Sequence, residues 1–162
     1  MSALVIGIAG GSGSGKTSVT MKILEFLDAH HVAVLQHDSY YKDLNVHQSH
    51  EPMEVNFDHP DSLDTSMLID HVRSLKSGKP ADQPIYNFAT HRRMKETKRL
   101  EPKEIIIVEG ILIFVEKELR DLMDIKIYID TDADERLIRT ASGPLHCTYS
   151  SRSLRTVMRP PA

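Results

Sequence analysis

Near its amino end the chain reads Leu4-Val-Ile-Gly-Ile-Ala-Gly10-Gly-Ser-Gly-Ser-Gly15-Lys16-Thr17. The first six residues form a short apolar run, which is typical of a strand buried on both faces of a parallel sheet. The remainder satisfies the pattern G-x-x-x-x-G-K-[ST] in full, and a helix-like segment follows at about residues 17–29. Because phosphate-binding loops lie between a strand and a helix in this way, the stretch predicts a P-loop.

The residue types of this loop suit a bound triphosphate. Glycines permit positive φ angles and let backbone N–H groups approach an anion beside the positive end of a helix. Lys16 adds a full positive charge, and a hydroxyl such as that of Thr17 is a Mg²⁺ ligand in loops of this kind. A glycine-rich turn without a ligand is the alternative, and the complete match disfavours it. The residues expected to bind the nucleotide are Gly10, Gly11, Ser12, Gly13, Ser14, Gly15, Lys16 and Thr17.

Length and composition indicate one folded domain. The chain has 162 residues, of which 40% are hydrophobic and 27% charged, so neither wholesale disorder nor a fibrous repeat fits. No apolar run approaches the roughly 20 residues of a membrane span. Cys147 is the single cysteine, which favours a reducing compartment, and a net charge of -3 argues against nucleic acid as the main partner. We expect a cytoplasmic protein without membrane or nucleic-acid partners.

Strand-like and helix-like segments alternate up to about residue 139, which is typical of βαβ units that build a parallel sheet. The pattern predicts an α/β protein with the three-layer P-loop NTPase fold and a mostly parallel sheet. Expected strands are residues 4–9, 32–35, 105–109 and 125–129, and expected helices are 17–29, 65–77 and 116–122. Residues 84–88 suggest an extended excursion or hairpin. The long connection 39–64 is expected to contact substrate.

The composition changes at residue 140. Residues 140–162 contain three arginines and no acidic residue, and they show neither helical nor strand periodicity. A helix that begins at Glu135, capped by Asp132 or Asp134, has barely started when the change occurs. We therefore predict an incomplete P-loop domain over 1–139, truncated at its C-terminal side, and a poorly ordered tail over 140–162.

Two acidic residues follow predicted strands. Asp38 comes just after the second strand, and Glu109 closes the apolar strand 105–108, which is the Walker B position. Ligands of parallel α/β sheets bind at the carboxyl ends of the strands, and phosphoryl transfer needs one carboxylate near the attacking hydroxyl and another near the metal. A turn-forming role is an equal alternative for Asp38.

Without an N-K-x-D or L-S-G-G-Q segment, a GTPase and a transporter ATPase are disfavoured, which leaves a small-molecule kinase.

Beyond the P-loop, five motifs occur in an order and spacing that resemble the uridine kinase (uridine-cytidine kinase) family over residues 4–139. They are Gln36-His-Asp38-Ser-Tyr-Tyr41, Asn56-Phe-Asp58-His-Pro-Asp61, Pro84-Ile-Tyr86-Asn-Phe88-Ala-Thr-His91, Val108-Glu109-Gly110-Ile-Leu112 and Asp130-Thr-Asp-Ala-Asp134. The resemblance implies pyrimidine salvage: a Mg²⁺-dependent transfer of the γ-phosphoryl group of ATP or GTP to the 5′-hydroxyl of uridine or cytidine, which gives UMP or CMP. It also implies a homotetramer.

The resemblance implies a role for each site residue. Asp38 would be the general base for the 5′-hydroxyl and would touch the water shell of the metal, and Lys16 would act with it in catalysis. Thr17 would bind Mg²⁺ directly, while Glu109 would hold metal-bound water. The implied nucleoside-binding residues are Asp58 for the ribose hydroxyls and Tyr86, Phe88 and His91 for the base. Without the resemblance, Tyr86 and Phe88 would be assigned to the inward face of a strand and His91 to a solvated loop.

Seven further histidines lack metal-ligand spacing and are expected at the surface or in turns. They are His30, His31, His37, His47, His50, His59 and His71.

The chain departs from the family pattern after Arg139. The family places an arginine where Thr140 stands and then an arginine-rich lid that would stabilise the transferred phosphoryl group. The departure suggests a reading-frame shift or an alternative 3′ end. It leaves two alternatives to an active uridine kinase. One is a catalytically inactive nucleotide-binding remnant, and the other is a kinase for another small hydroxyl substrate such as pantothenate or phosphoribulose.

Overall fold

The central feature of the fold is a parallel sheet, seen in a computed structural model that describes residues 3–43 and 56–141. Its strands are β1 (Leu4–Gly10), β2 (Val32–Gln36), β5 (Ile105–Gly110) and β6 (Ile125–Ile129), in the order β2-β5-β1-β6. All three strand pairs are parallel. The predicted parallel sheet is therefore confirmed. Of the tail predicted over 140–162, residues 140 and 141 belong to a helix and residues 142–162 lie outside the described residues.

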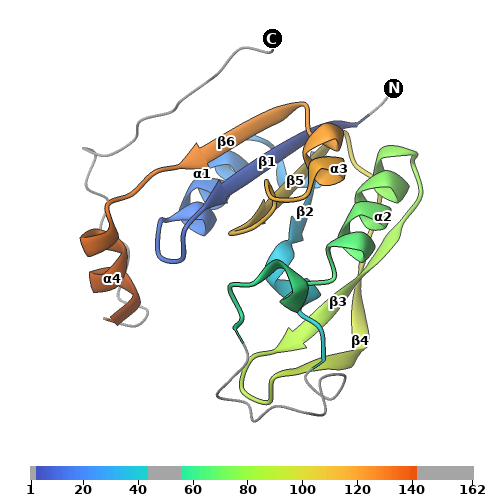
Figure 1. The fold of residues 1–162 in the computed structure, drawn as a ribbon. Coiled ribbons are helices and arrows are strands. Elements are labelled where there is room, and N and C mark those ends of the chain that lie inside the picture. The colour runs from blue at the N-terminus through green and yellow to red at the C-terminus, as the bar shows by residue number, and fades with distance from the viewer. Residues whose placement is uncertain (1–2, 44–55, 142–162) are drawn as a thin grey trace.

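Helices cover both faces of this sheet and give three layers (Figure 1). Side chains alternate along β1, so that Val5 and Ala9 join one core cluster and Ile6 and Ile8 the other. The first cluster packs beneath α2 (Thr65–Lys76) and α3 (Lys117–Leu122), and the second packs beneath α1 (Lys16–Phe26). This arrangement confirms the three-layer α/β prediction.

The first helix is shorter than predicted. It ends at Phe26, and the chain is extended at Leu27 before a 3₁₀ turn at Ala29–His31. Val19, Ile23 and Leu27 pack on the sheet as the periodicity indicates. Phe26 falls at the same helical interval after Val19 and Ile23 but is 88% exposed, because the helix ends there and the chain is extended at the next residue.

The helix α2 matches its prediction closely. Asp64 caps it, since its side chain accepts a hydrogen bond from the backbone N–H of Met67 at 3.2 Å. Gly78, with φ of 79°, follows the end of the helix at Lys76. The buried face of α2 consists of Leu68, Ile69, Val72 and Leu75.

A separate antiparallel hairpin extends from the main sheet (Figure 1). It pairs β3 (Ala81–Asn87) with β4 (Arg92–Leu100), and an irregularity in register lies between Pro84 and Tyr86. The hairpin suggested by the sequence is confirmed and is longer than residues 84–88. In space, β3 contacts the 3₁₀ turn His37–Tyr40, which we call the Asp38 turn.

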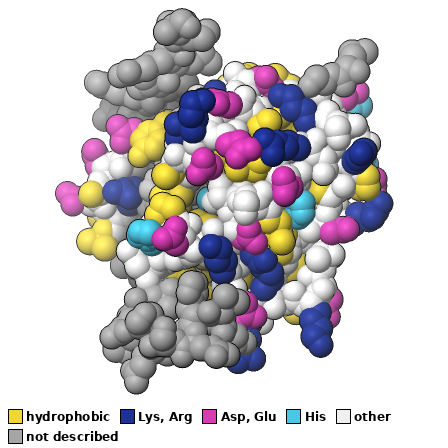
Figure 2. Space-filling view, turned by 45° about the vertical axis from the view of Figure 1, so that its right-hand side comes forward, with side chains coloured by type: hydrophobic (Ala, Val, Ile, Leu, Met, Phe, Trp, Pro, Cys, Tyr) yellow, Lys and Arg dark blue, Asp and Glu magenta, His cyan; other side chains and the backbone are white. Residues whose placement is uncertain are grey.

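The remaining helix, α4 (Ala133–Ala141), begins two residues before the predicted start at Glu135. The described residues contain no helix that is both long and apolar enough to span a bilayer. Basic and acidic side chains are interspersed over the face drawn in Figure 2.

Candidate active site

The loop between β1 and α1 has the backbone that anion binding requires. Gly13 has a φ of 72° and Gly15 a φ of 96°, both in the left-handed region that glycine adopts without steric cost. Gly15 is also the N-cap of α1, so the amides that follow it lie at the positive end of the helix dipole. The backbone N–H of Ser14 donates to the carbonyl of Gly11 at 3.1 Å and closes the loop.

Two cations lie against this loop. The Nζ of Lys16 donates to the carbonyl oxygen of Gly11 at 3.0 Å. Burial lowers the pKa of Lys16, while the negative charges of Asp38 and Glu109 raise it. The second cation is Arg136 of α4, which sequence reasoning missed: any side chain at Gly11 would collide with its guanidinium, and its charge further lowers the pKa of Lys16.

A cavity of about 340 Å³ joins the loop to the carboxyl ends of β2 and β5. Among the predicted site residues it brings together Ser12, Gly13, Lys16, Thr17, Asp38, Phe88 and Glu109. Gly10, Gly11, Ser14 and Gly15 belong to the same loop but do not line the cavity. Residues without a predicted role also line it, namely Gln36, Ser39, Gly110 and Ile111.

Glu109 is held by two hydrogen bonds inside the protein. Glu109 is only 5% exposed. Its Oε2 accepts a hydrogen bond from the Thr20 hydroxyl at 3.0 Å, and its Oε1 accepts one from Gln36 Nε2 at 3.0 Å. Gln36 lies directly opposite Glu109 in the β2–β5 register, and Thr20 is one helical turn after Lys16. These two positions could have been found from the strand pairing and the helical repeat.

Asp38 lies near the start of the 3₁₀ turn His37–Tyr40, close to the charged side chains of Lys16 and Glu109. Burial raises its pKa, the positive charge of Lys16 lowers it, and the negative charges of Glu109 and Asp58 raise it. Asp38 therefore lies within electrostatic range of one lysine, Lys16, and of two other carboxylates, Glu109 and Asp58. This is a charge distribution that a metal cation or a transferable proton would relieve.

The donor atoms of this cavity fit Mg²⁺. Thr17, Asp38 and Glu109 offer one hydroxyl and two carboxylates, which are the hard oxygen ligands that Mg²⁺ prefers. Over residues 3–43 and 56–141 no group of three or more His, Cys, Asp or Glu side chains has metal-binding geometry. Each Glu109 oxygen still has a lone pair available for metal-bound water.

The predicted base-binding residues form an aromatic cluster beside the cavity. The Tyr86 ring lies 5.1 Å from that of Phe88 and 5.4 Å from that of Tyr41, and the His91 ring stacks on Phe57 at 5.2 Å. Of these residues only Phe88 lines the cavity. Tyr41 and Phe57 were not assigned a role from the sequence, although both lie within the quoted motifs.

Two polar atoms of this cluster are left without a hydrogen-bond partner among the described residues. They are the hydroxyl of Tyr86 and Nδ1 of His91, and both are buried. Burying such atoms without a partner is unfavourable, so a ligand that supplied one would be bound selectively. Asp58 is exposed at the edge of the cluster, next to Phe57 in the chain.

Among the remaining histidines, which were expected at the surface or in turns, His37 does lie in a turn but is buried, which the sequence did not indicate. It is 1% exposed, and its Nε2 forms a hydrogen bond with the Thr65 hydroxyl at 3.1 Å. Its ring packs against Gly110, where a side chain would collide with it. His71 is half-buried and bonds the Tyr40 hydroxyl, whereas His30, His31 and His59 are exposed and His47 and His50 lie outside the described residues.

Burial of His37 makes stability depend on pH. Burial lowers its pKa from 6.5 to about 4. Between these values the unfolded chain binds a proton that the folded chain does not, so we expect acidification from pH 6.5 to 4 to destabilise the fold, by up to about 3 kcal/mol from this residue. Melting temperatures of wild type, His37→Gln and the exposed control His30→Gln would check this. The fall in Tm should be smaller in His37→Gln alone; an unchanged fall would contradict the prediction.

Comparison with known proteins identifies the family of the chain. The model of the phosphoribulokinase / uridine kinase family matches residues 5–142. The chain belongs to this family. The match confirms the resemblance that the motifs indicated, and the P-loop kinase fold agrees with it.

Members of the family with similar sequences include bacterial enzymes. The uridine kinase of Bacillus subtilis (strain 168) is 53% identical over 140 residues, which are 84% of this chain and 64% of that protein. The uridine kinase of Bacillus velezensis is 52% identical over 142 residues, 85% of this chain and 65% of that protein. A solved structure of a possible uridine kinase from Bacillus stearothermophilus has a TM-score of 0.65 and 26% identity, covering 86% of this chain and 77% of that one. The chain thus spans less than two thirds of the length of these curated relatives.

Proposed function

We propose that the chain transfers the γ-phosphoryl group of ATP or GTP to the 5′-hydroxyl of uridine or cytidine, giving UMP or CMP. The observation that carries this proposal is the cavity in which Lys16 and Thr17 of the phosphate loop meet Asp38 and Glu109. The similarity to proteins named uridine kinase supports a pyrimidine nucleoside as the acceptor.

The phosphate loop would bind the triphosphate. Its amides and the N-terminus of α1 surround the phosphate oxygens, and Lys16 stabilises the negative charge that develops on the transferred group. Thr17, Asp38 and Glu109 would hold Mg²⁺ directly or through water, and the ion supplies charge neutralisation across the outer phosphates. The contact of Lys16 with Gly11 keeps its ammonium inside the loop before nucleotide binds.

Asp38 would act on the acceptor. The 5′-oxygen attacks the γ-phosphorus while the bond from that phosphorus to the bridging oxygen of the diphosphate breaks, and the hydroxyl proton passes to the Asp38 carboxylate. A carboxylate whose pKa is raised by burial accepts this proton more readily than an exposed one does.

The aromatic cluster would select the nucleoside. Phe88 and Tyr86 provide ring faces for the pyrimidine, and the unpartnered Tyr86 hydroxyl and His91 Nδ1 provide hydrogen bonds to its polar edge. Asp58 would accept hydrogen bonds from the ribose hydroxyls. We further propose a homo-oligomer working in the cytoplasm, in keeping with the single cysteine.

The test is an acceptor panel with purified protein, ATP and Mg²⁺. We expect monophosphate from uridine and cytidine, and none from pantothenate or ribulose 5-phosphate, with products separated by chromatography. The absence of UMP and CMP above a control without protein would overturn the proposal. In that case a rise in Tm on adding ATP would favour the catalytically inactive nucleotide-binding alternative, while phosphorylation of another acceptor would favour a different kinase specificity.

A further inference from the structure

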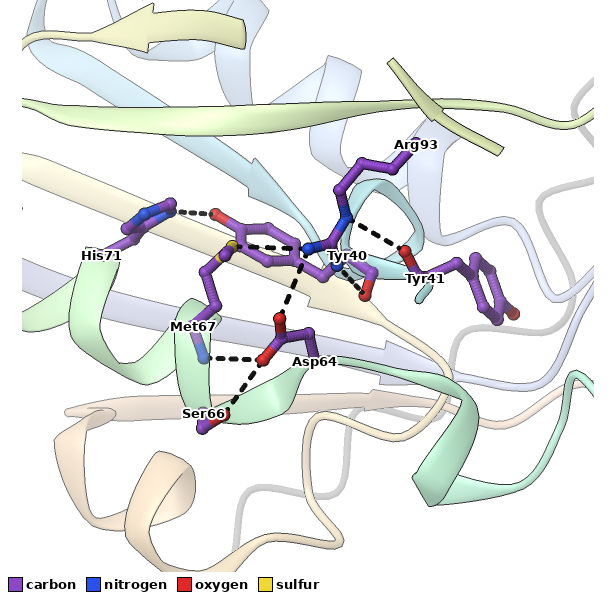
Figure 3. A network of polar contacts seen from close by, with 7 residues as sticks. All are labelled: Tyr40, Tyr41, Asp64, Ser66, Met67, His71 and Arg93. Atoms are coloured by element: carbon purple, nitrogen blue, oxygen red, sulfur yellow. Dashed lines mark hydrogen bonds and ion pairs between the residues drawn. The ribbon is translucent and has the colours of Figure 1, made fainter. Parts of the chain in front are cut away.

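Arg93 of β4 reaches across to the segment that carries Asp38 (Figure 3). Its Nε donates to the Tyr41 carbonyl at 3.2 Å and its Nη2 donates to the Tyr40 carbonyl at 3.0 Å. Its Nη1 donates to Asp64 Oδ2 at 3.3 Å, and the side chain is only 22% exposed. One guanidinium therefore joins the hairpin, the end of the Asp38 turn and the start of α2.

The residues that Arg93 contacts are themselves fixed. Asp64 caps α2 through Met67 and Ser66, and its own backbone N–H donates to the Tyr40 carbonyl at 2.8 Å. The Tyr40 hydroxyl forms a 2.9 Å hydrogen bond with His71 Nδ1 on the next turn of α2 (Figure 3). Tyr40 is thus held at both its backbone and its ring, and it lies two residues after Asp38.

A further tie connects the hairpin with the same turn. The buried Gln83 of β3 donates from Nε2 to the Ser39 hydroxyl at 2.8 Å, and Ser39 lines the cavity beside Asp38. On the other side of the turn, the Tyr41 ring contacts Tyr86 at 5.4 Å. Arg93 consequently binds the backbone at the point where the Asp38 turn passes into the aromatic cluster.

We propose that Arg93 is a positioning residue for the reaction: it fixes the Asp38 turn so that Asp38 faces the phosphate loop while Tyr41 supports the nucleoside cluster. The proposal rests on the proposed function. The planar fork of arginine makes three directed, charge-assisted bonds at once, which neither lysine nor glutamine can reproduce. Displacing a catalytic group by about 1 Å costs on the order of 100-fold in rate.

The test compares Arg93→Gln and Arg93→Lys with the control Arg99→Gln. Arg99 lies on the same strand, is 61% exposed at its side chain and contacts only Asp82 and Glu101 among the ion pairs of the described residues. We expect both Arg93 variants to lower kcat and raise the KM for uridine, with kcat/KM reduced by at least about tenfold. The Kd for Mg·ATP should stay within about twofold, because the phosphate loop follows β1 of the four-stranded sheet, whereas Arg93 lies on the separate hairpin sheet. Arg99→Gln should match wild type in every measurement.

A second measurement separates positioning from general destabilisation. Backbone hydrogen exchange should accelerate at residues 38–42 in the Arg93 variants and stay unchanged in β1 and α1. Unchanged kcat/KM and exchange in a folded Arg93→Lys protein would overturn the proposal, as would an equal loss of ATP binding and uridine turnover. If wild type makes no UMP, the proposed function fails, but exchange at residues 38–42 still supports or overturns the role of Arg93.

Discussion

Replacing Lys16 with alanine should remove both tight nucleotide binding and phosphoryl transfer. The ammonium lies in the loop against Gly11 and within electrostatic range of Asp38 and Glu109. Without it, the loop keeps its amide dipoles and the neighbouring guanidinium of Arg136, but it loses its own ammonium, and the two carboxylates oppose an incoming anion. We expect kcat/KM to fall by about 10³-fold or more, since one preorganised electrostatic contact in a catalytic site has an effect of this order.

The control for Lys16→Ala is Lys22→Ala. Lys22 lies on the same helix, α1, and is exposed. The Lys22→Ala substitution removes the same charge from the same helix, but outside the loop. ATP binding, measured by calorimetry, and turnover of uridine should therefore both stay near wild type. A Lys16→Ala protein that kept wild-type ATP affinity would contradict the assignment of the loop.

Asp38→Asn should separate binding from catalysis. The amide keeps the size of the side chain but cannot accept the hydroxyl proton, so we expect kcat to fall by about 10² to 10⁴-fold. Removing a negative charge near the triphosphate should leave ATP affinity equal or higher. Asp70→Asn on the exposed side of α2 is the matched control and should retain activity, because Asp70 contacts only the surface residue Arg73 among the ion pairs of the described residues.

The pH profile gives a second, independent check of Asp38. Catalysis requires the carboxylate form, so kcat/KM should rise with pH through the pKa of this group. Burial raises that pKa above 3.8, and the acidic limb should therefore lie at higher pH than for an exposed aspartate. The residual activity of Asp38→Asn should lack this limb; a limb that persisted unchanged would assign it to another group.

The sequence predicted the sheet and its phosphate loop because both depend on local patterns. An apolar run such as residues 4–9 can only be a buried strand when glycines and Lys16 follow it, and the confirmed positive φ angles of Gly13 and Gly15 are those that the loop pattern requires. The charged residues at strand ends, Asp38 and Glu109, were likewise brought to one cavity, since parallel strands end at one edge.

The features that the sequence did not predict depend on contacts between segments that are distant in the chain. Nothing in the local pattern around Arg93 indicates that it crosses to Tyr40 and Tyr41, which are more than 50 residues away in the chain. The burial of His37 is also a tertiary effect, because α2 and the Gly110 segment close over it. Residue type alone favours the surface for a histidine in a polar turn, and packing overrides that preference.

The proposed donor and acceptor sites lie on two different sheets, and this separation has an evolutionary consequence. The proposed phosphate donor site lies on the four-stranded sheet, whereas the rings proposed to choose the acceptor come largely from the separate hairpin β3–β4 and its neighbouring turn. Mutations in the hairpin can therefore change which alcohol is bound as acceptor without disturbing the loop proposed to bind the triphosphate. A lineage built on this plan can exchange one acceptor for another in small steps, and each intermediate retains a working phosphate donor site.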